Sequence, residues 1–79
     1  NLNNMYIYTK DQLLNLSNFS RLERSGQRLQ FFSIDNKLAI DIVCKNGTEA
    51  RAIILEIIDF MNDPNNTDSV FKISEDRLW

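Results

Sequence analysis

The chain of 79 residues contains no histidine, one cysteine, one proline and two glycines. The missing histidine removes the commonest general base, proton shuttle and metal ligand. A single cysteine, Cys44, excludes a disulfide within this chain, so a reducing cytoplasm is the expected location. The two glycines fit a turn and a helix start, and they leave no glycine-rich phosphate loop. Catalysis and metal binding are therefore disfavoured, and no cofactor is expected.

Long apolar runs are missing as well. No stretch approaches the roughly 20 apolar residues needed to span a bilayer, and no signal peptide is recognisable. The net charge of −2 argues against a general binder of nucleic acid or of anionic membranes, because either would be expected to carry a basic excess. The whole chain is 43% hydrophobic and 25% charged, a composition typical of globular proteins. Its length fits one domain spanning residues 1–79.

Residues 46–62 have the length and periodicity of a helix. Asn46 is a good N-cap, Glu49 is placed to reach back in a variant of the capping box, and Pro64 ends the helix. Leu55 lies among polar residues, so we expect it to be covered by the chain or to be an oligomer contact. The apolar stripe on the other side is formed by Ala50, Ile53, Ile54, Ile57, Ile58 and Met61.

Two-residue turns at positions 25–26 and 35–36 predict a three-stranded antiparallel meander, because Gly, Asn and Asp tolerate the positive φ of such turns. Opposite residues share a face, and the implied pairs separate an apolar face from a polar one. Moving either turn by one residue is expected to mix the faces. The pairs are Phe19 with Phe32, Leu22 with Leu29, Glu23 with Arg28, Arg28 with Val43, Leu29 with Ile42, Gln30 with Asp41, Phe31 with Ile40, Phe32 with Ala39, and Ser33 with Leu38.

The predicted fold class is α+β, an antiparallel meander with one amphipathic helix packed on one face. The sheet's share of the core is expected to be Leu22, Leu29, Phe31, Leu38, Ile40, Ile42 and Cys44. Residues 5–9 favour a short strand, and residues 13–17 favour an extended segment or a turn of helix. Residues 64–69 read as a polar loop, and the tail, residues 70–79, can add an edge strand at 70–73. Residues 1–4 are expected to fray.

The residues that could carry chemistry have plainer interpretations. Glu56 and Asp59 form a solvated helix face, Asp41 beside Arg28 forms a surface ion pair, and Cys44 is a buried thiol. We therefore predict that the chain is not an enzyme.

The outer face of the sheet is the predicted partner-binding site. Apolar side chains rimmed by charge suit a protein-binding surface, since they supply groups to desolvate and polar atoms that fix orientation. The site residues are Phe19, Arg21, Arg28, Phe32 and Ile34. In a second interpretation, the segment 6–8 or the tail around Phe71 and Trp79 folds over this face.

The resulting functional prediction is a small non-catalytic protein-interaction module, self-associating through Leu55 or through the Phe19 and Phe32 face. The alternative is a protein that binds or sequesters a small molecule or nucleotide in a pocket lined by Arg21, Arg24 or Arg28 at an oligomer interface. Single-stranded nucleic acid, stacked on the two phenylalanines, is a weaker alternative because acidic residues share the face.

Residues 14–19, Leu-Asn-Leu-Ser-Asn-Phe, precede the meander and a helix that opens with Thr48-Glu49-Ala50. This arrangement resembles small proteins of phages and mobile elements of Gram-positive bacteria, which show an extended Asn-Leu-Asp/Ser-Asn segment, several antiparallel strands and a final helix beginning Glu-Glu-Ala. The tail after Pro64 and the threonine at position 48 depart from that pattern. The resemblance implies a modulator of a host protein, including inhibition of host defence by binding a protein or by sequestering a nucleotide signal.

Overall fold

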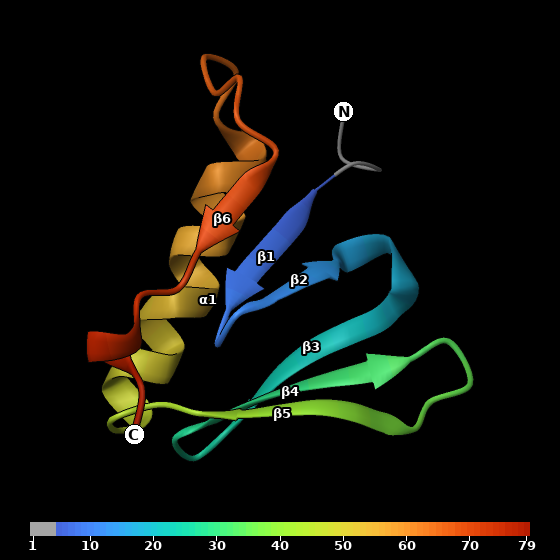
Figure 1. Ribbon diagram of the computed structural model, residues 1–79, viewed down its shortest axis with the longest axis vertical. Helices are drawn as coiled ribbons and strands as arrows, with labels where there is room; N and C mark the ends of the chain where they lie inside the picture. The colour runs from blue at the N-terminus through green and yellow to red at the C-terminus, as the bar shows by residue number, and fades with distance from the viewer. Residues whose placement is uncertain (1–4) are drawn as a thin grey trace.

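The computed structural model describes residues 5–79, and the expected fraying of residues 1–4 lies outside that range. Within it the α+β class is confirmed, with one α-helix and two three-stranded sheets (Figure 1). The elements are β1 Tyr6–Thr9, β2 Gln12–Asn15, η2 Leu16–Asn18, β3 Phe19–Ser25, β4 Arg28–Ser33, β5 Leu38–Val43, α1 Gly47–Asn62, β6 Val70–Lys72 and η3 Glu75–Arg77, where η marks a 3₁₀ helix.

Helix α1 begins and ends where the sequence indicates. The side-chain oxygen of Asn46 accepts a hydrogen bond from the backbone N–H of Glu49 at 2.8 Å, which confirms the N-cap. The carboxylate of Glu49 does not complete the predicted capping box, because it accepts a hydrogen bond from Arg77 instead. Asp63 is extended, as expected for a residue before Pro64, and the helix stops there.

Strands β3, β4 and β5 form the predicted antiparallel meander in that order. The β4/β5 register is as predicted as far as the pair of Phe31 with Ile40, and it then changes because Ala39 forms a bulge. Phe32 therefore lies opposite Leu38, and the predicted pairs of Phe32 with Ala39 and of Ser33 with Leu38 are wrong. Since residues opposite each other share a face, Leu38 lies on the outer face and not in the predicted core.

The loop of this hairpin explains the change of register. It has three residues, 34–36, because the backbone N–H of Ser33 donates to the carbonyl of Lys37 at 2.8 Å. Asn36 closes the loop with a φ of 68°, a left-handed conformation that asparagine tolerates. One residue more in the loop than predicted is compensated by the bulge in β5.

The turn between β3 and β4 lies at Gly26 and Gln27, one residue later than predicted. Leu22 consequently pairs with Phe31 and not with Leu29. Moving a two-residue turn by one position shifts the register by two, which keeps every side chain on its own face. The expectation that such a shift would mix the faces was wrong, and Leu22 remains on the inner face.

A second, mixed sheet forms from the two ends of the described chain, in the order β2-β1-β6, and the sequence did not predict it. β1 is antiparallel to β2 and parallel to β6. Lys10 and Asp11 join β1 to β2 with φ values of 48° and 61°, as a type I′ turn requires. The segment 13–17 contains both expected forms, the end of β2 and the start of η2. β6 is an edge strand, but of this sheet and not of the meander.

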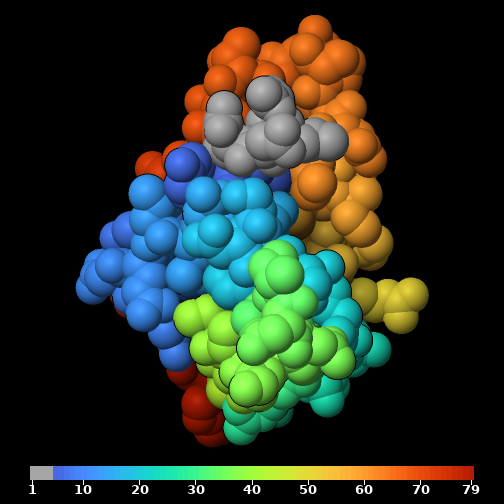
Figure 2. All heavy atoms as spheres, turned by 90° about the vertical axis from the view of Figure 1, so that its right-hand side faces the viewer, coloured from blue at the N-terminus to red at the C-terminus, as the bar shows by residue number. Residues whose placement is uncertain are grey.

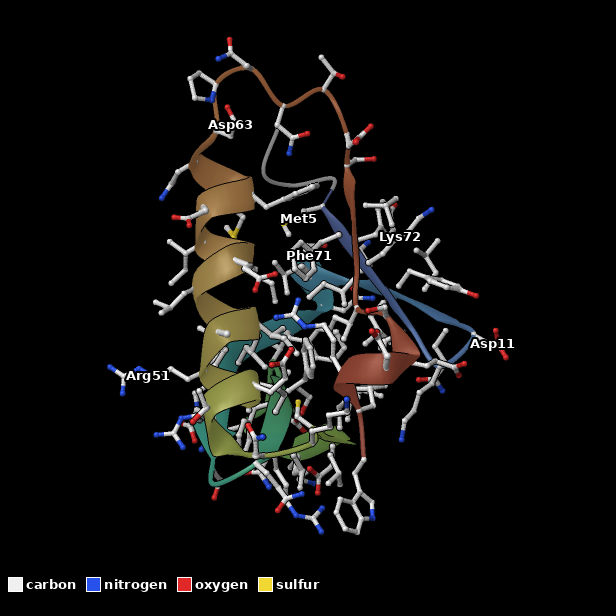
Figure 3. All side chains as sticks on the ribbon, turned by 90° about the vertical axis from the view of Figure 1, so that its left-hand side faces the viewer. Met5, Asp11, Arg51, Asp63, Phe71 and Lys72 are labelled. Carbon is white, nitrogen blue, oxygen red and sulfur yellow. The ribbon has the colours of Figure 1, made fainter. Side chains whose placement is uncertain are left out.

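The core lies between α1 and both sheets (Figure 3). Phe71 points from β6 toward the helix and meets Phe60 edge-on, with ring centroids 5.5 Å apart, while Lys72 points away. Helix α1 therefore covers the second sheet as well as the predicted one. The buried hydrophobic residues are Met5, Ile7, Leu29, Phe31, Ile42, Cys44, Ala50, Ile53, Ile57, Ile73 and Leu78. Of the predicted core and helix stripe, Leu22, Ile40, Ile54 and Met61 are half-buried against this cluster, and Leu38 and Ile58 are exposed.

Replacing Ile53, which is fully buried, by alanine should lower the free energy of unfolding by about 2–5 kcal/mol, because it removes packed atoms and leaves a cavity. Urea unfolding followed by circular dichroism measures the loss. Arg51→Ala is the matched control, since Arg51 is exposed on the same helix and points into solvent (Figure 3), and it should change stability by less than about 0.5 kcal/mol. Equal losses in the two variants would contradict the core described above.

Candidate functional site

Arg21 and Phe32 meet on the outer face of the β3-β4-β5 sheet. The guanidinium carbon of Arg21 lies 3.8 Å from the centroid of the Phe32 ring, a cation–π contact. Its Nε forms an ion pair with Glu23 at 2.6 Å, and its Nη1 donates to the side-chain oxygen of Asn36. Two neighbours, Glu23 and Asn36, thus hold Arg21 against the Phe32 ring, which limits the conformational freedom of its side chain before any partner binds.

Arg28 lies at the far end of the same strand from Phe32. Its Nη1 forms an ion pair with Asp41 at 2.8 Å, as the sequence predicted. Both side chains are substantially exposed, so the pair contributes at most about 1 kcal/mol to stability. The pair places two charged side chains at the end of the outer face that is farthest from Phe32.

The apolar part of the outer face lies at the tip of the β4-β5 hairpin. Leu38 lies opposite half-buried Phe32 and is 48% exposed, while Ile34 in the loop is 72% exposed. We call Phe32, Ile34, Leu38 and Arg21 the hairpin patch. It contains three of the five predicted site residues, together with Leu38, which the sequence had assigned to the core.

Phe19 does not belong to the patch. A bulge at Ser20 breaks the β3/β4 register, so Phe19 pairs with Ser33 instead of the predicted Phe32. Its ring meets Phe31 edge-on on the inner side of the sheet, with centroids 5.3 Å apart. The predicted position of Phe19 on the outer face is therefore wrong, and its role is in core packing.

Within the part of the chain that the structure describes, residues 6–8 and 70–79 do not run across the hairpin patch. β1 and β6 pair with each other in the second sheet. The tail continues alongside the end of β5, where Leu78 bridges Cys44 and the backbone N–H of Trp79 donates to the carbonyl of Val43 at 3.0 Å. The interpretation that these segments cover the outer face is accordingly wrong.

A second apolar surface lies between α1 and β3. A groove of about 310 Å³ is lined by residues of both elements and by η2. Figure 2 shows α1 (yellow to orange) beside the cyan segment that contains this strand. Exposed Ile58 contributes to the lining, and Leu55, three residues earlier on the helix, is 53% exposed. The sequence indicates Leu55 as a residue outside the apolar stripe, whereas it predicts Ile58 in the core because Ile58 continues that stripe; the exposure of Ile58 corrects this prediction.

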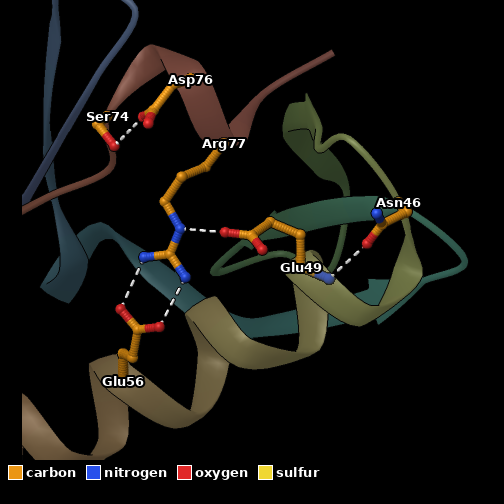
Figure 4. A network of polar contacts seen from close by, with 6 residues as sticks. All are labelled: Asn46, Glu49, Glu56, Ser74, Asp76 and Arg77. Carbon is orange, nitrogen blue, oxygen red and sulfur yellow. Dashed lines mark hydrogen bonds and ion pairs between the residues drawn. The ribbon is translucent and has the colours of Figure 1, made fainter.

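Arg77 connects the tail to α1 (Figure 4). Its Nη1 and Nη2 donate to the two carboxylate oxygens of Glu56 at 2.7 and 2.6 Å, and its Nε donates to Glu49. These hydrogen bonds lower the pKa of Glu56 below its usual range. The sequence around the helix gives one indication of this network: Glu49 and Glu56 are two helical turns apart and therefore share a helix face. The cation that joins them comes from a distant segment.

Comparison of the chain with protein-family models, with curated proteins and with solved structures finds no match. The resemblance to small proteins of phages and mobile elements therefore stays a prediction.

The three arginines proposed for a nucleotide pocket have different neighbours. Arg21 contacts Glu23 and Phe32, Arg28 pairs with Asp41, and Arg24 donates to the carbonyl of Gly26 at 3.0 Å. The groove beside α1 includes Arg21 but neither of the other two among its lining residues. Since the alternative requires only one of these arginines in a pocket at an oligomer interface, it stays a prediction.

Cys44 is buried, and burial raises the pKa of its thiol, so the reactive thiolate is disfavoured. No group of three potential metal ligands comes together within residues 5–79. Over the same residues, no helix has the length and apolarity to cross a membrane.

The Arg77 network predicts how stability depends on pH. The folded-state pKa of Glu56 is lowered, so its contribution is present above its unfolded value of about 4.3 and is lost as pH falls through the lower folded value. Glu56→Gln should therefore lose less unfolding free energy than the wild type between about pH 6 and pH 3. The difference should stay below about 1 kcal/mol, because the carboxylate is partly exposed to solvent.

Urea unfolding at both pH values measures this difference. Asp59→Asn is the matched control, since it removes an exposed carboxylate from the same helix outside the Arg77 network. Identical pH dependence in wild type and Glu56→Gln would show that the ion pair does not contribute to folding.

Proposed function

We propose that this domain is a non-catalytic protein-interaction module that binds a partner protein through the hairpin patch. The observation that carries the proposal is the exposure of Ile34 and Leu38 beside a phenylalanine ring on which an arginine is already positioned. Contiguous apolar patches rimmed by polar residues commonly mark a binding surface, whereas single exposed apolar side chains do not.

The composition of the patch suits protein recognition. Aromatic and arginine side chains are enriched among residues that contribute most to binding, and Phe32 with Arg21 supplies both. Because Arg21 is held by Glu23 and Asn36, less conformational freedom is lost when a partner binds. The partner that fits presents an apolar side chain to Leu38 and Ile34.

The finer proposal is that a phage or mobile element encodes this domain and that the domain modulates a protein of the host. It is supported by the resemblance of residues 14–19 and of the helix opening at 48–50, and it names the class of partner to be sought.

The proposal predicts that replacing Ile34 and Leu38 together by aspartate abolishes partner binding, because two carboxylates cannot be buried against an apolar surface without a large desolvation cost. Proteins retained by the immobilised wild-type domain are identified, and each is purified and titrated by calorimetry. The double variant should weaken binding at least tenfold. Leu13→Asp is the matched control, since Leu13 is equally apolar and exposed but lies on β2 of the other sheet.

A partner that binds the double variant within twofold of wild type would show that the hairpin patch is not the binding site. A thermal-shift screen with cyclic nucleotides and short oligonucleotides distinguishes the alternatives, because a bound ligand raises the melting temperature. A rise with any of these compounds would favour the nucleotide-binding function.

A further inference from the structure

β3 is an edge strand. Within residues 5–79 it has β4 on one side and no strand on the other, so one row of its backbone N–H and C=O groups is open to pairing. The groove beside α1 adjoins this strand. An open strand edge and an exposed apolar helix side thus lie next to each other.

The sequence of β3 is complementary to itself when two copies run antiparallel. If a two-fold axis passes through Leu22, Arg21 of each copy lies opposite Glu23 of the other, and Leu22 lies opposite Leu22. Opposite charges at such cross-strand positions are favourable, and like charges are unfavourable. Registers centred on the neighbouring residues place Arg21 against Arg21 or Glu23 against Glu23. Only one register that preserves the faces is therefore complementary in charge.

The same register covers the exposed apolar residues of the helix. Leu22 lies on the inner face, where it lines the groove together with Ile54 and Ile58. An axis perpendicular to the sheet at Leu22 keeps both helices on one side of a continuous sheet, so they face each other across the axis. Ile58 lines the groove next to the axis, and Leu55 lies about one helical turn before it on α1. Burial of these two exposed side chains between the helices supplies apolar contacts that a short strand ladder lacks.

We infer that two copies of this chain associate through their β3 strands, centred on Leu22, with Leu55 and Ile58 at the contact between the helices. The interface is isologous, and it joins the two meanders into a six-stranded sheet. It lies along the β3 edge and the helix and shares Arg21 with the hairpin patch, whose other members, Phe32, Ile34 and Leu38, lie at the tip of the β4-β5 hairpin. The inference does not depend on the proposed function.

Charged residues on an edge strand also protect many monomeric proteins from pairing, and the bulge at Ser20 shortens the usable edge. That protection works by repulsion between like charges or by an unpaired buried charge. In β3, Arg21 and Glu23 lie on the outer, wet face and form an ion pair within one copy. In the antiparallel register each also lies opposite the other residue of the second copy, so pairing two copies buries neither charge alone. The charge pattern of β3 therefore favours a second copy of this chain as the partner of its free edge.

The inference is tested by sedimentation equilibrium of the whole chain over about 10 μM to 1 mM, at low and high salt. The expected result is reversible dimerisation that weakens as salt rises, because exposed ion pairs are screened. A monomer at every concentration would overturn it.

Charge reversal tests the register. Arg21→Glu alone and Glu23→Arg alone should each weaken dimerisation at least tenfold, because each places two like charges opposite one another twice. An equimolar mixture of the two variants should form a heterodimer, since every facing pair is then of opposite sign. The double variant R21E/E23R should dimerise by itself. No other register predicts this pattern of loss and recovery.

Lys37→Glu is the control for charge alone, since Lys37 is exposed in the segment that joins β4 to β5 and should leave dimerisation within twofold of wild type. Leu55→Asp should weaken dimerisation at least tenfold through the helices. Circular dichroism and urea unfolding confirm that each variant is folded. A folded pair of charge variants that fails to associate on mixing would overturn the inference, as would a wild-type dimer that is insensitive to all these changes.

Discussion

Burial of the apolar side of α1 is the constraint on which the rest of the structure depends. Ile53 and Ile57 are shielded from water, and one three-stranded sheet offers a single inner face against which to bury them. The meander alone does not cover the apolar side of the helix, so other segments of the described chain complete the core. β1 and β6 supply Ile7 and Phe71 on the side of the helix that the meander does not reach. Arg77 then fixes the tail to the same helix by binding Glu49 and Glu56.

Periodicity was sufficient to predict the helix and the meander because both signals are local. The stripe around Ile53 repeats at helical spacing, and the alternation around Phe31 repeats every second residue. The prediction that Leu22 lies on the inner face is correct although the predicted turn position is wrong, because the β3/β4 register differs from the predicted one by two residues. What local patterns could not give was the parallel pairing of β1 with β6, since neither short strand indicates its partner at the other end of the chain.

The candidate site was predicted only in part, and two bulges account for the difference. An extra residue at Ser20 turns Phe19 inward against Phe31, and an extra residue at Ala39 turns Leu38 outward beside Phe32. A bulge inverts the face of the residues beyond it and has no compositional signature of its own. The outer face therefore contains Leu38 and not the predicted Phe19, whereas Arg21, Arg28 and Phe32 lie where they were predicted. The two exchanged residues lie at strand ends, where strand pairing is easiest to change.

A dimer joined at β3 places both hairpin patches on one side of a continuous sheet, because the two-fold axis is perpendicular to that sheet. Two identical binding surfaces held in a fixed geometry favour a partner that is itself symmetric or that repeats the recognised feature. For such a partner the second contact is intramolecular, and the overall affinity exceeds that of one patch without any new contact. A partner with one binding site gains nothing from the arrangement. Comparing the dimeric domain with a monomeric Leu55→Asp form, in which the patch residues are unchanged, therefore separates the affinity of the patch from the effect of its duplication.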